Sequence, residues 1–131
     1  MRSRAAIVVK LGGSQAGGLH VGRWLDVLAS CAGQVVLVAG GGPFADAVRT
    51  AQSKMGFDDV TAHHMALLAM EQFGRALASL RPGFALADST AAVAGALQAG
   101  RVPVWAPLFM ASRAPDIPAS WDVTSDSLAA W

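Results

Sequence analysis

A lysine followed by two glycines and a serine is the first group of residues whose types and spacing could do chemistry. Lys10 stands in an apolar run, and Gly12, Gly13 and Ser14 come directly after that run. An ammonium group among apolar residues is costly unless an anion such as a phosphate accompanies it. Glycine-rich turns that lead into helices offer an anion unpaired N–H groups and the positive end of the helix dipole. The pattern predicts a phosphate-binding loop; the alternative is a lysine that reaches solvent past Gly12.

Three consecutive glycines form a second turn of the same kind. Gly40, Gly41 and Gly42 separate another apolar run from a predicted helix. Glycines permit backbone conformations, and a close approach of a ligand, that side chains would block. The N–H groups of this turn could bind the phosphate or carboxylate of a substrate, although a tight strand-to-helix turn also explains the residues. Neither turn has the spacing of a Walker loop or of a dinucleotide-binding glycine motif.

Two adjacent histidines raise the question of metal binding, but their spacing argues against it. His63 and His64 stand near the start of a long predicted helix. Neighbouring side chains on a helix point about 100° apart. Neither histidine has a cysteine or a carboxylate four residues further on. We therefore expect no metal site; one histidine could line a ligand pocket, and the plain alternative is one histidine in the core and the other exposed.

These residues require elements that position them, and the hydrophobic pattern supplies an alternation of strands and helices. Continuous apolar runs predict strands at 5–11, 34–39, 84–87 and 102–106. Amphipathic segments predict helices at 19–32, 44–55, 60–80 and 89–99, and a further helix begins at 122–126. Asp58 or Asp59 is expected to cap the third helix. The alternation predicts an α/β fold, a three-layer α/β/α sandwich with a mostly parallel sheet.

The remaining side chains have structural explanations. Trp24 and Val27 on the first helix, and Leu68 on the third, are expected in the core, whereas Glu71 is expected to be solvated. Residues 107–121 contain three prolines and are predicted to be a loop. The tryptophans that flank this loop could stack on a flat ligand ring or simply be buried; they are Trp105 and Trp121.

The composition is that of one globular domain. The chain has 131 residues, of which 53% are hydrophobic, and a formal net charge of +1. Its ten basic and nine acidic residues are scattered, without the clustered basic face that nucleic-acid binding requires. No apolar stretch approaches the ~20 residues of a membrane span. The single cysteine, Cys31, allows no internal disulfide and is expected to be buried and inert. We expect a cytoplasmic protein with neither a nucleic-acid nor a membrane partner.

Three segments resemble, in the same order, the amino acid kinase family, which includes acetylglutamate, uridylate and isopentenyl phosphate kinases. They read V-V-K-L-G-G-S, V-L-V-A-G-G-G-P-F-A-D and W-D-V-T-S-D-S-L-A-A. The resemblance covers essentially the whole chain. Among the branches, it looks closest to the kinase of methanofuran biosynthesis, through A-H-H-M-A, A-M-E-Q and W-A-P. That kinase transfers phosphate from ATP to aminomethylfuran methyl phosphate.

The resemblance implies a small-molecule kinase that uses ATP and Mg2+, and it gives roles to the matching residues. Lys10 would hold the transferring phosphoryl group, and Asp126 would orient the catalytic lysines. The ATP phosphates would also meet the backbone of Gly12, Gly13 and Ser14. The acceptor would meet Gly40, Gly41, Gly42, His63, Thr124 and Ser125. Helix capping alone also explains the residue types at 124–126.

The resemblance also implies a longer protein, whose second half carries an adenine pocket and a second phosphate-binding lysine. Residues 1–131 would be its N-terminal part, which binds the acceptor substrate and phosphate, and we expect the C-terminal nucleotide-binding part to be absent. A homo-oligomer and a small-molecule phosphate acceptor are the expected partners. The alternatives are a non-catalytic oxyanion-binding protein of the same fold and a Rossmann-like domain with structural glycine turns. The presence of both Lys10 and Asp126 favours the kinase.

Overall fold

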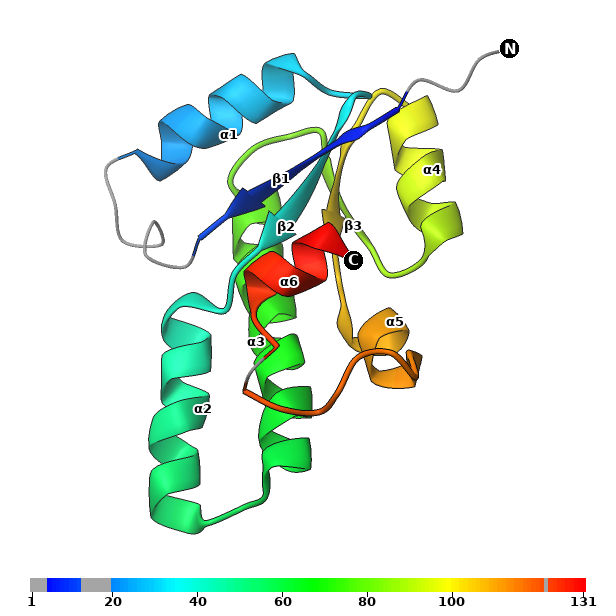
Figure 1. Ribbon diagram of the computed structural model, residues 1–131. Helices are drawn as coiled ribbons and strands as arrows, with labels where there is room; N and C mark the ends of the chain where they lie inside the picture. The colour runs from blue at the N-terminus through cyan, green and yellow to red at the C-terminus, as the bar shows by residue number, and fades with distance from the viewer. Residues whose placement is uncertain (1–4, 13–19, 122) are drawn as a thin grey trace.

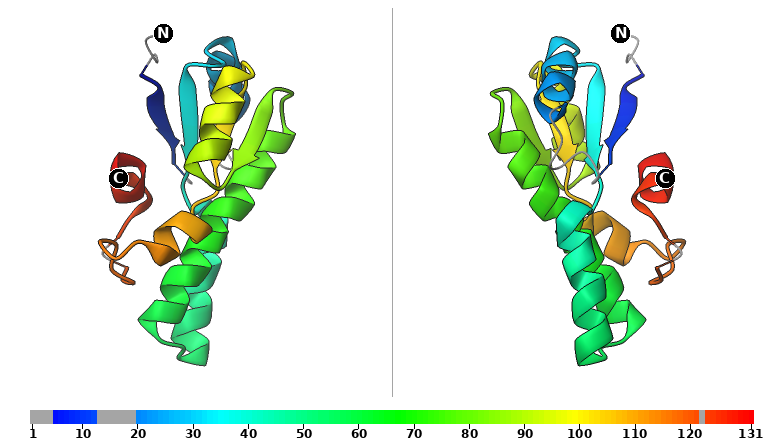
Figure 2. Two further views of the ribbon diagram at one scale, coloured as in Figure 1. Left: turned by 90° about the vertical axis from the view of Figure 1, so that its right-hand side faces the viewer. Right: turned by 90° about the vertical axis from the view of Figure 1, so that its left-hand side faces the viewer.

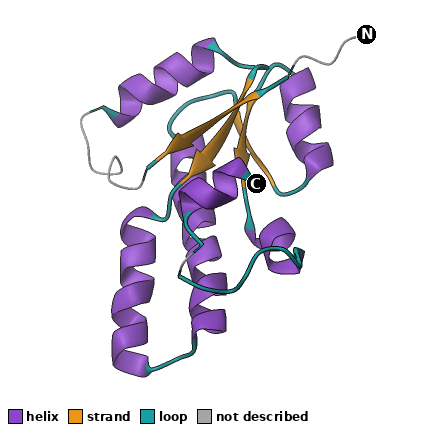
Figure 3. Cartoon of the chain, in the orientation of Figure 1, coloured by secondary structure: helices purple, strands orange, loops and turns teal. Residues whose placement is uncertain are grey.

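The computed structural model describes residues 5–12, 20–121 and 123–131, which form a parallel sheet with helices packed on it (Figure 1, Figure 3). The strands are β1 (Ile7–Leu11), β2 (Val35–Ala39), β3 (Phe84–Ala87) and β4 (Val102–Trp105). Their order across the sheet is β1-β2-β4-β3, and each neighbouring pair is parallel. The helices are α1 (Val21–Ser30), α2 (Gly42–Met55), α3 (Asp59–Ser79), α4 (Thr90–Gln98), α5 (Leu108–Arg113) and α6 (Ser125–Ala130).

Side chains that alternate along the strands form a core on each face of the sheet. On one face, Leu37 of β2 belongs to a cluster with Leu25 of α1 and Phe73 of α3. On the other face, Val38 belongs to a cluster with Leu128 of α6. Figure 2 shows α5 and α6 on one side of the strands and α3 on the other. Because β2 is buried along its whole length, it reads as a continuous apolar run, and the predicted layered α/β fold is confirmed.

The predicted elements agree with the observed ones to within two residues at either end. Asp58 is the N-cap of α3, where its carboxylate accepts a hydrogen bond from the N–H of Thr61 at 2.8 Å. This hydrogen bond lowers the pKa of Asp58. No helix within the described ranges is long and apolar enough to cross a membrane.

The predicted loop at 107–121 is partly wrong, because it contains the short helix α5. The N–H of Leu108, in the first turn of α5, donates to Oε1 of Glu71 at 2.9 Å. An N–H group in the first turn of a helix has no partner within that helix, and Glu71 supplies one from α3. Glu71 is therefore not simply solvated. The pairing joins residues 37 positions apart, so local sequence patterns could not reveal it.

Several apolar side chains predicted to lie in the core are instead half-exposed. Trp24 is 48% and Val27 55% exposed, and Leu68 of α3 is 42% exposed. Of the residues in α1, only Leu25 and Leu28 are buried, which means that one narrow stripe of the helix meets the sheet. Cys31 is half-buried rather than buried.

Candidate functional site

The end of β1 and the glycine turn after β2 lie side by side at the carboxyl edge of the sheet. In the parallel pair of β1 and β2, Lys10 is opposite Val38 and Leu11 is opposite Ala39. The N–H of Gly40 continues this ladder by donating to the carbonyl of Leu11 at 3.0 Å. Ligands of open parallel sheets bind at this edge, where the strands end and the loops begin.

Lys10 has a carboxylate partner from the far end of the chain. Its Nζ lies 3.1 Å from Oδ1 of Asp126, and 26% of the lysine side chain is exposed. Because α6 packs against β1 and β2, Asp126 reaches the strand that carries Lys10. Oγ1 of Thr124 accepts the N–H of Ser127 at 3.2 Å and so caps α6. The capping interpretation therefore accounts for Thr124, whereas Asp126 uses its carboxylate on the lysine.

The glycine turn after β2 requires glycine at two positions. Gly42 has φ = +57°, in the left-handed region that favours glycine. Gly41 has an ordinary φ of −76° and is the N-cap of α2, but a Cβ there would overlap the Cβ of Ala45. Any side chain at Gly41 would therefore displace the start of α2.

A small pocket of about 130 Å³ brings together four of the six residues predicted to meet an acceptor. The four are Gly41, His63, Thr124 and Ser125. Gly40 is buried and Gly42 is half-buried in the turn, and neither lines the pocket. The lining also contains Ala45, Arg49, Ala66, Leu67, Met70, Trp121, Val123 and Leu128.

His63 is the buried polar side chain of this pocket, with 6% of its surface exposed. Burial is the main cause that lowers its pKa, and the charge of His64 acts in the same direction. A hydrogen bond with the backbone of Ser120 opposes both effects. His63 is thus neutral at pH 7 and can offer a hydrogen bond without a charge. His64 is exposed, which agrees with the alternative of one buried and one exposed histidine, and the contact of His63 with an acceptor stays a prediction.

Two polar side chains beside the pocket, Arg49 and Gln52, were missed by the sequence analysis, and both contact Trp121. Trp121 donates from Nε1 to Oε1 of Gln52 at 2.8 Å. The guanidinium carbon of Arg49 lies 4.6 Å from the centroid of the Trp121 ring. The available signal was the spacing of Gly41, Ala45 and Arg49, because residues four apart share one face of a helix. Trp121 was expected either to be buried or to stack on a ligand ring, and its actual contacts are with α2.

A second pocket, of about 270 Å³, lies at the end of β1 and includes the predicted phosphate-binding residues that the structure describes. Lys10 and Gly12 line it, together with Val9, Leu11, Trp24 and Leu28. Gly13 and Ser14 lie outside the described residues, so their predicted contacts with ATP stay predictions. Within the described part of the chain, no group of three or more His, Cys, Asp or Glu residues could hold a metal ion.

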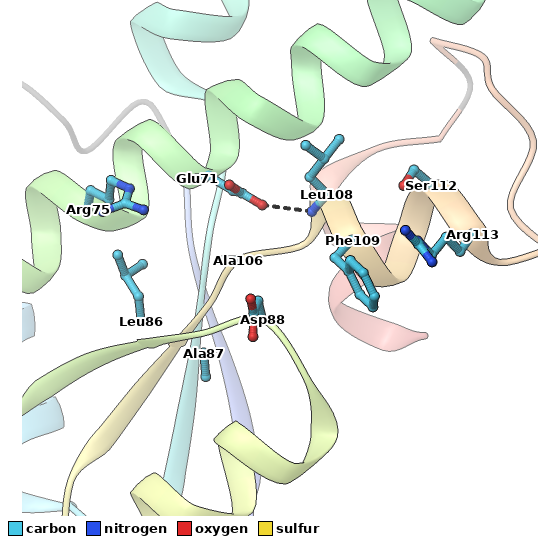
Figure 4. Close-up of a pocket in the computed structure, with 10 residues that line it drawn as sticks. All are labelled: Glu71, Arg75, Leu86, Ala87, Asp88, Ala106, Leu108, Phe109, Ser112 and Arg113. Carbon is cyan, nitrogen blue, oxygen red and sulfur yellow. Dashed lines mark hydrogen bonds between the residues drawn. The ribbon is translucent and has the colours of Figure 1, made fainter.

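The largest of these pockets, of about 480 Å³, contains none of the predicted site residues (Figure 4). It lies between α3, α5 and the carboxyl ends of β3 and β4, where Asp88, Arg75 and Arg113 contribute charges of both signs. These three side chains are exposed. We therefore assign the candidate site to the two smaller pockets, one lined by Lys10 and the other by the buried His63.

The fold is that of a known class of α/β proteins. Ten chains of solved structures are similar to this one. Uridylate kinase from Archaeoglobus fulgidus matches with a TM-score of 0.63 and 21% identity over 76% of this chain and 50% of that chain. The likeness shows the fold, and the chain spans about half the length of that kinase.

The family follows from the sequence model that the chain matches. Residues 5–131 match the model of the amino acid kinase family. The chain therefore belongs to the amino acid kinase family. A search of curated proteins finds no match.

Proposed function

We propose that this chain is the acceptor- and phosphate-binding part of an ATP-dependent small-molecule kinase. The observation that carries the proposal is the ion pair of Lys10 with Asp126 at 3.1 Å. The residue before Asp126, Ser125, lines the pocket of about 130 Å³, and Lys10 lines the pocket of about 270 Å³. An acceptor in the first pocket and a phosphate chain in the second would meet at this pair.

Lys10 would neutralise negative charge on the transferring phosphoryl group and would form no covalent bond with it. Phosphoryl transfer depends mainly on positioning and on neutralising the charge of the transferring group. The ammonium of Lys10 would donate hydrogen bonds to the oxygens of that group. Asp126 would act as a positioning residue, because its carboxylate keeps the flexible lysine side chain in one direction.

The residues beside Lys10 fit the phosphates of a nucleotide. Gly12 has no side chain, so its backbone can approach a phosphate closely, and the pocket next to it has about 270 Å³ of space. Mg2+ usually keeps several waters and binds through substrate phosphates with one or two carboxylates. ATP would therefore bring most of the ligands of its own Mg2+, and the ion would neutralise phosphate charge during transfer.

The acceptor that we propose is a small molecule with a phosphate or carboxylate group. The glycine turn at Gly41 presents the N-terminus of α2, which favours an anion, and His63 adds a neutral hydrogen-bonding group. Aminomethylfuran methyl phosphate is the first acceptor to test, because of the resemblance to the methanofuran branch. Uridylate and other small phosphate compounds are the further acceptors in the panel to be tested.

The test is phosphoryl transfer by the full-length protein that contains this chain. With ATP, Mg2+ and aminomethylfuran methyl phosphate, we expect a diphosphate product that 31P NMR detects. Lys10→Ala should lower kcat by about 100-fold or more, as the loss of one transition-state donor does. Lys54→Ala is the matched control, because Lys54 is the chain's other lysine and stands exposed in the last turn of α2.

Equal turnover by wild type and Lys10→Ala would contradict the role of Lys10. Saturable binding of phosphate or molybdate, without turnover of any acceptor in the panel, would instead favour the non-catalytic oxyanion-binding alternative.

A further inference from the structure

We propose that Arg49, held by Trp121, is the counter-ion that selects acceptors by their negative charge. The inference rests on the proposed function, since it names how the acceptor pocket recognises its ligand. The acceptor's phosphate or carboxylate group would bind the guanidinium of Arg49 in the pocket of about 130 Å³.

The first argument is the position of Arg49 on α2. Gly41, Ala45 and Arg49 all line the pocket, and they are spaced four residues apart, so they share one face of the helix. Arg49 therefore stands two turns along from the glycine turn, facing the same space. An anion in the pocket could then meet both the start of α2 and the guanidinium.

The second argument is the charge of the pocket. Its described lining contains one arginine and no carboxylate. The lowered pKa of His63 keeps that histidine neutral at pH 7. Lys10, the other cation of the site, does not line this pocket. Among the described lining residues, Arg49 thus carries the single positive charge, and hydroxyl groups at Thr124 and Ser125 can add hydrogen bonds to an anion.

The third argument is that Trp121 holds Arg49 in place. The guanidinium carbon lies 4.6 Å from the ring centroid, close enough for a cation–π contact. The indole is fixed in turn, because its Nε1 donates to Oε1 of Gln52 at 2.8 Å. Nε2 of Gln52 donates to Oδ1 of Asp59 at 2.9 Å and to the carbonyl of Phe57 at 3.1 Å. A chain of hydrogen bonds therefore runs from the end of α2 and the start of α3 to the ring.

The contact with the Trp121 ring leaves N–H groups of the Arg49 guanidinium available to donate hydrogen bonds to a ligand. An arginine can rest against an aromatic ring while the N–H groups of its planar fork bind a carboxylate or phosphate. The observed partner of that fork is the exposed Asp46, at 3.2 Å from Nη1. An acceptor anion would compete with Asp46 for the guanidinium.

The experiment measures anion binding directly, so that it does not depend on turnover. The full-length protein is titrated with inorganic phosphate and, separately, with aminomethylfuran methyl phosphate and its dephosphorylated alcohol. Binding is followed by the 15N-NMR signal of the Trp121 indole, which the Trp121→Phe variant identifies. We expect saturable binding of both phosphates by wild type, with a shift of that signal, and weaker or no binding of the alcohol.

Arg49→Gln should weaken the binding of both phosphates about 10-fold or more, as the loss of a charge-assisted hydrogen bond does. Lys54→Gln, which removes the same charge from the same helix, should leave the dissociation constant unchanged. Asp46→Asn should tighten binding, because it removes the competing carboxylate. Unchanged indole signals of the other tryptophans would show that each variant is folded.

Two results would overturn the inference: equal dissociation constants for Arg49→Gln and Lys54→Gln, or no saturable phosphate binding by wild type. If the two variants bind phosphate equally but the full-length protein still transfers phosphate from ATP, the kinase proposal stays intact and only the role of Arg49 is wrong. Arg49-dependent binding without turnover would leave the inference intact and remove the kinase proposal.

Discussion

At the scale of single residues, Lys10 depends on a contact that crosses almost the whole chain. Its carboxylate partner, Asp126, belongs to the last helix, and the two charged atoms lie 3.1 Å apart. The carboxylate is 77% exposed, and exposed ion pairs contribute little to stability. The ion pair therefore adds little to the stability of the fold, and the proposed role of Asp126 is to direct Lys10.

Asp126→Asn tests that role, because asparagine has the shape of aspartate without its charge. We expect kcat to fall about 10-fold or more, as when a hydrogen bond to a charged group is lost, with little change in the acceptor KM. A double-mutant cycle with Lys10→Ala is the sharper measurement. If Asp126 acts through Lys10, adding Asp126→Asn to Lys10→Ala should cause little further loss. Additive losses would show that the two residues act separately.

His63 makes stability depend on pH. Burial lowers the pKa of His63 below its ordinary value of 6.5, so the unfolded chain binds a proton more readily than the folded protein does. Stability is therefore fully present above pH 6.5 and decreases as the pH falls from there through the lowered pKa.

Thermal unfolding followed by circular dichroism at several pH values measures this dependence. His63→Gln should reduce the loss of Tm below pH 6.5, because glutamine takes up no proton. His20→Gln is the control, since His20 is exposed and lies outside the pocket. Parallel pH profiles for wild type and His63→Gln would contradict the assignment.

At the scale of elements, α2 begins where it does because the turn before it has no side chains. A Cβ at Gly41 would overlap the Cβ of Ala45, one turn into the helix. In α4, by contrast, a Cβ at Gly95 would meet no atom within 4 Å other than the neighbouring residues and backbone of its own helix. The same substitution should therefore have opposite effects at the two positions.

Gly41→Ala should lower the free energy of unfolding by about 1–3 kcal/mol, the usual cost of overpacking. Gly95→Ala should raise it by about 0.5–1 kcal/mol, because alanine is the better helix former. Urea unfolding of the two variants gives both values. Equal changes in the same direction would mean that the contact with Ala45 does not constrain the turn.

At the scale of the whole molecule, the edge strand β1 leaves apolar surface exposed. Ile7 is 64% and Val8 50% exposed, and Figure 2 shows β1 at the margin of the sheet. On α1, Trp24 and Val27 add half-exposed apolar side chains. Apolar patches of this kind favour association, and an open edge strand offers unpaired backbone groups as well.

We therefore predict that residues 1–131 self-associate as their concentration rises. Sedimentation velocity should show a larger average mass with concentration, and Ile7→Lys should shift the protein toward the monomer, because a charged edge residue opposes strand pairing. Leu80→Lys adds the same charge at another exposed apolar position and should have little effect. Association that both variants weaken equally would point to general charge repulsion instead of the β1 edge.

The strands, the helices other than α5 and the glycine turn after β2 could be predicted from the sequence. Apolar runs such as 34–39 and the cap at Asp58 act within a few residues, so their patterns are visible in the order of residues. The charge of Lys10 within an apolar strand also signalled an anionic partner. The family resemblance added Asp126 and the residues expected to meet the acceptor, whose roles are still to be tested.

Only the tertiary structure decided which of these residues meet. Three contacts join segments that are distant along the chain. They are the ion pair of Lys10 with Asp126, the hydrogen bond from the N–H of Leu108 to Glu71, and the cation–π contact of Arg49 with Trp121. Such contacts depend on how the sheet is ordered and which face each helix covers. The sequence by itself therefore determined the local elements and the types of group at the candidate site. The packing of those elements decided the partners, because side chains distant along the chain come together only when their elements do.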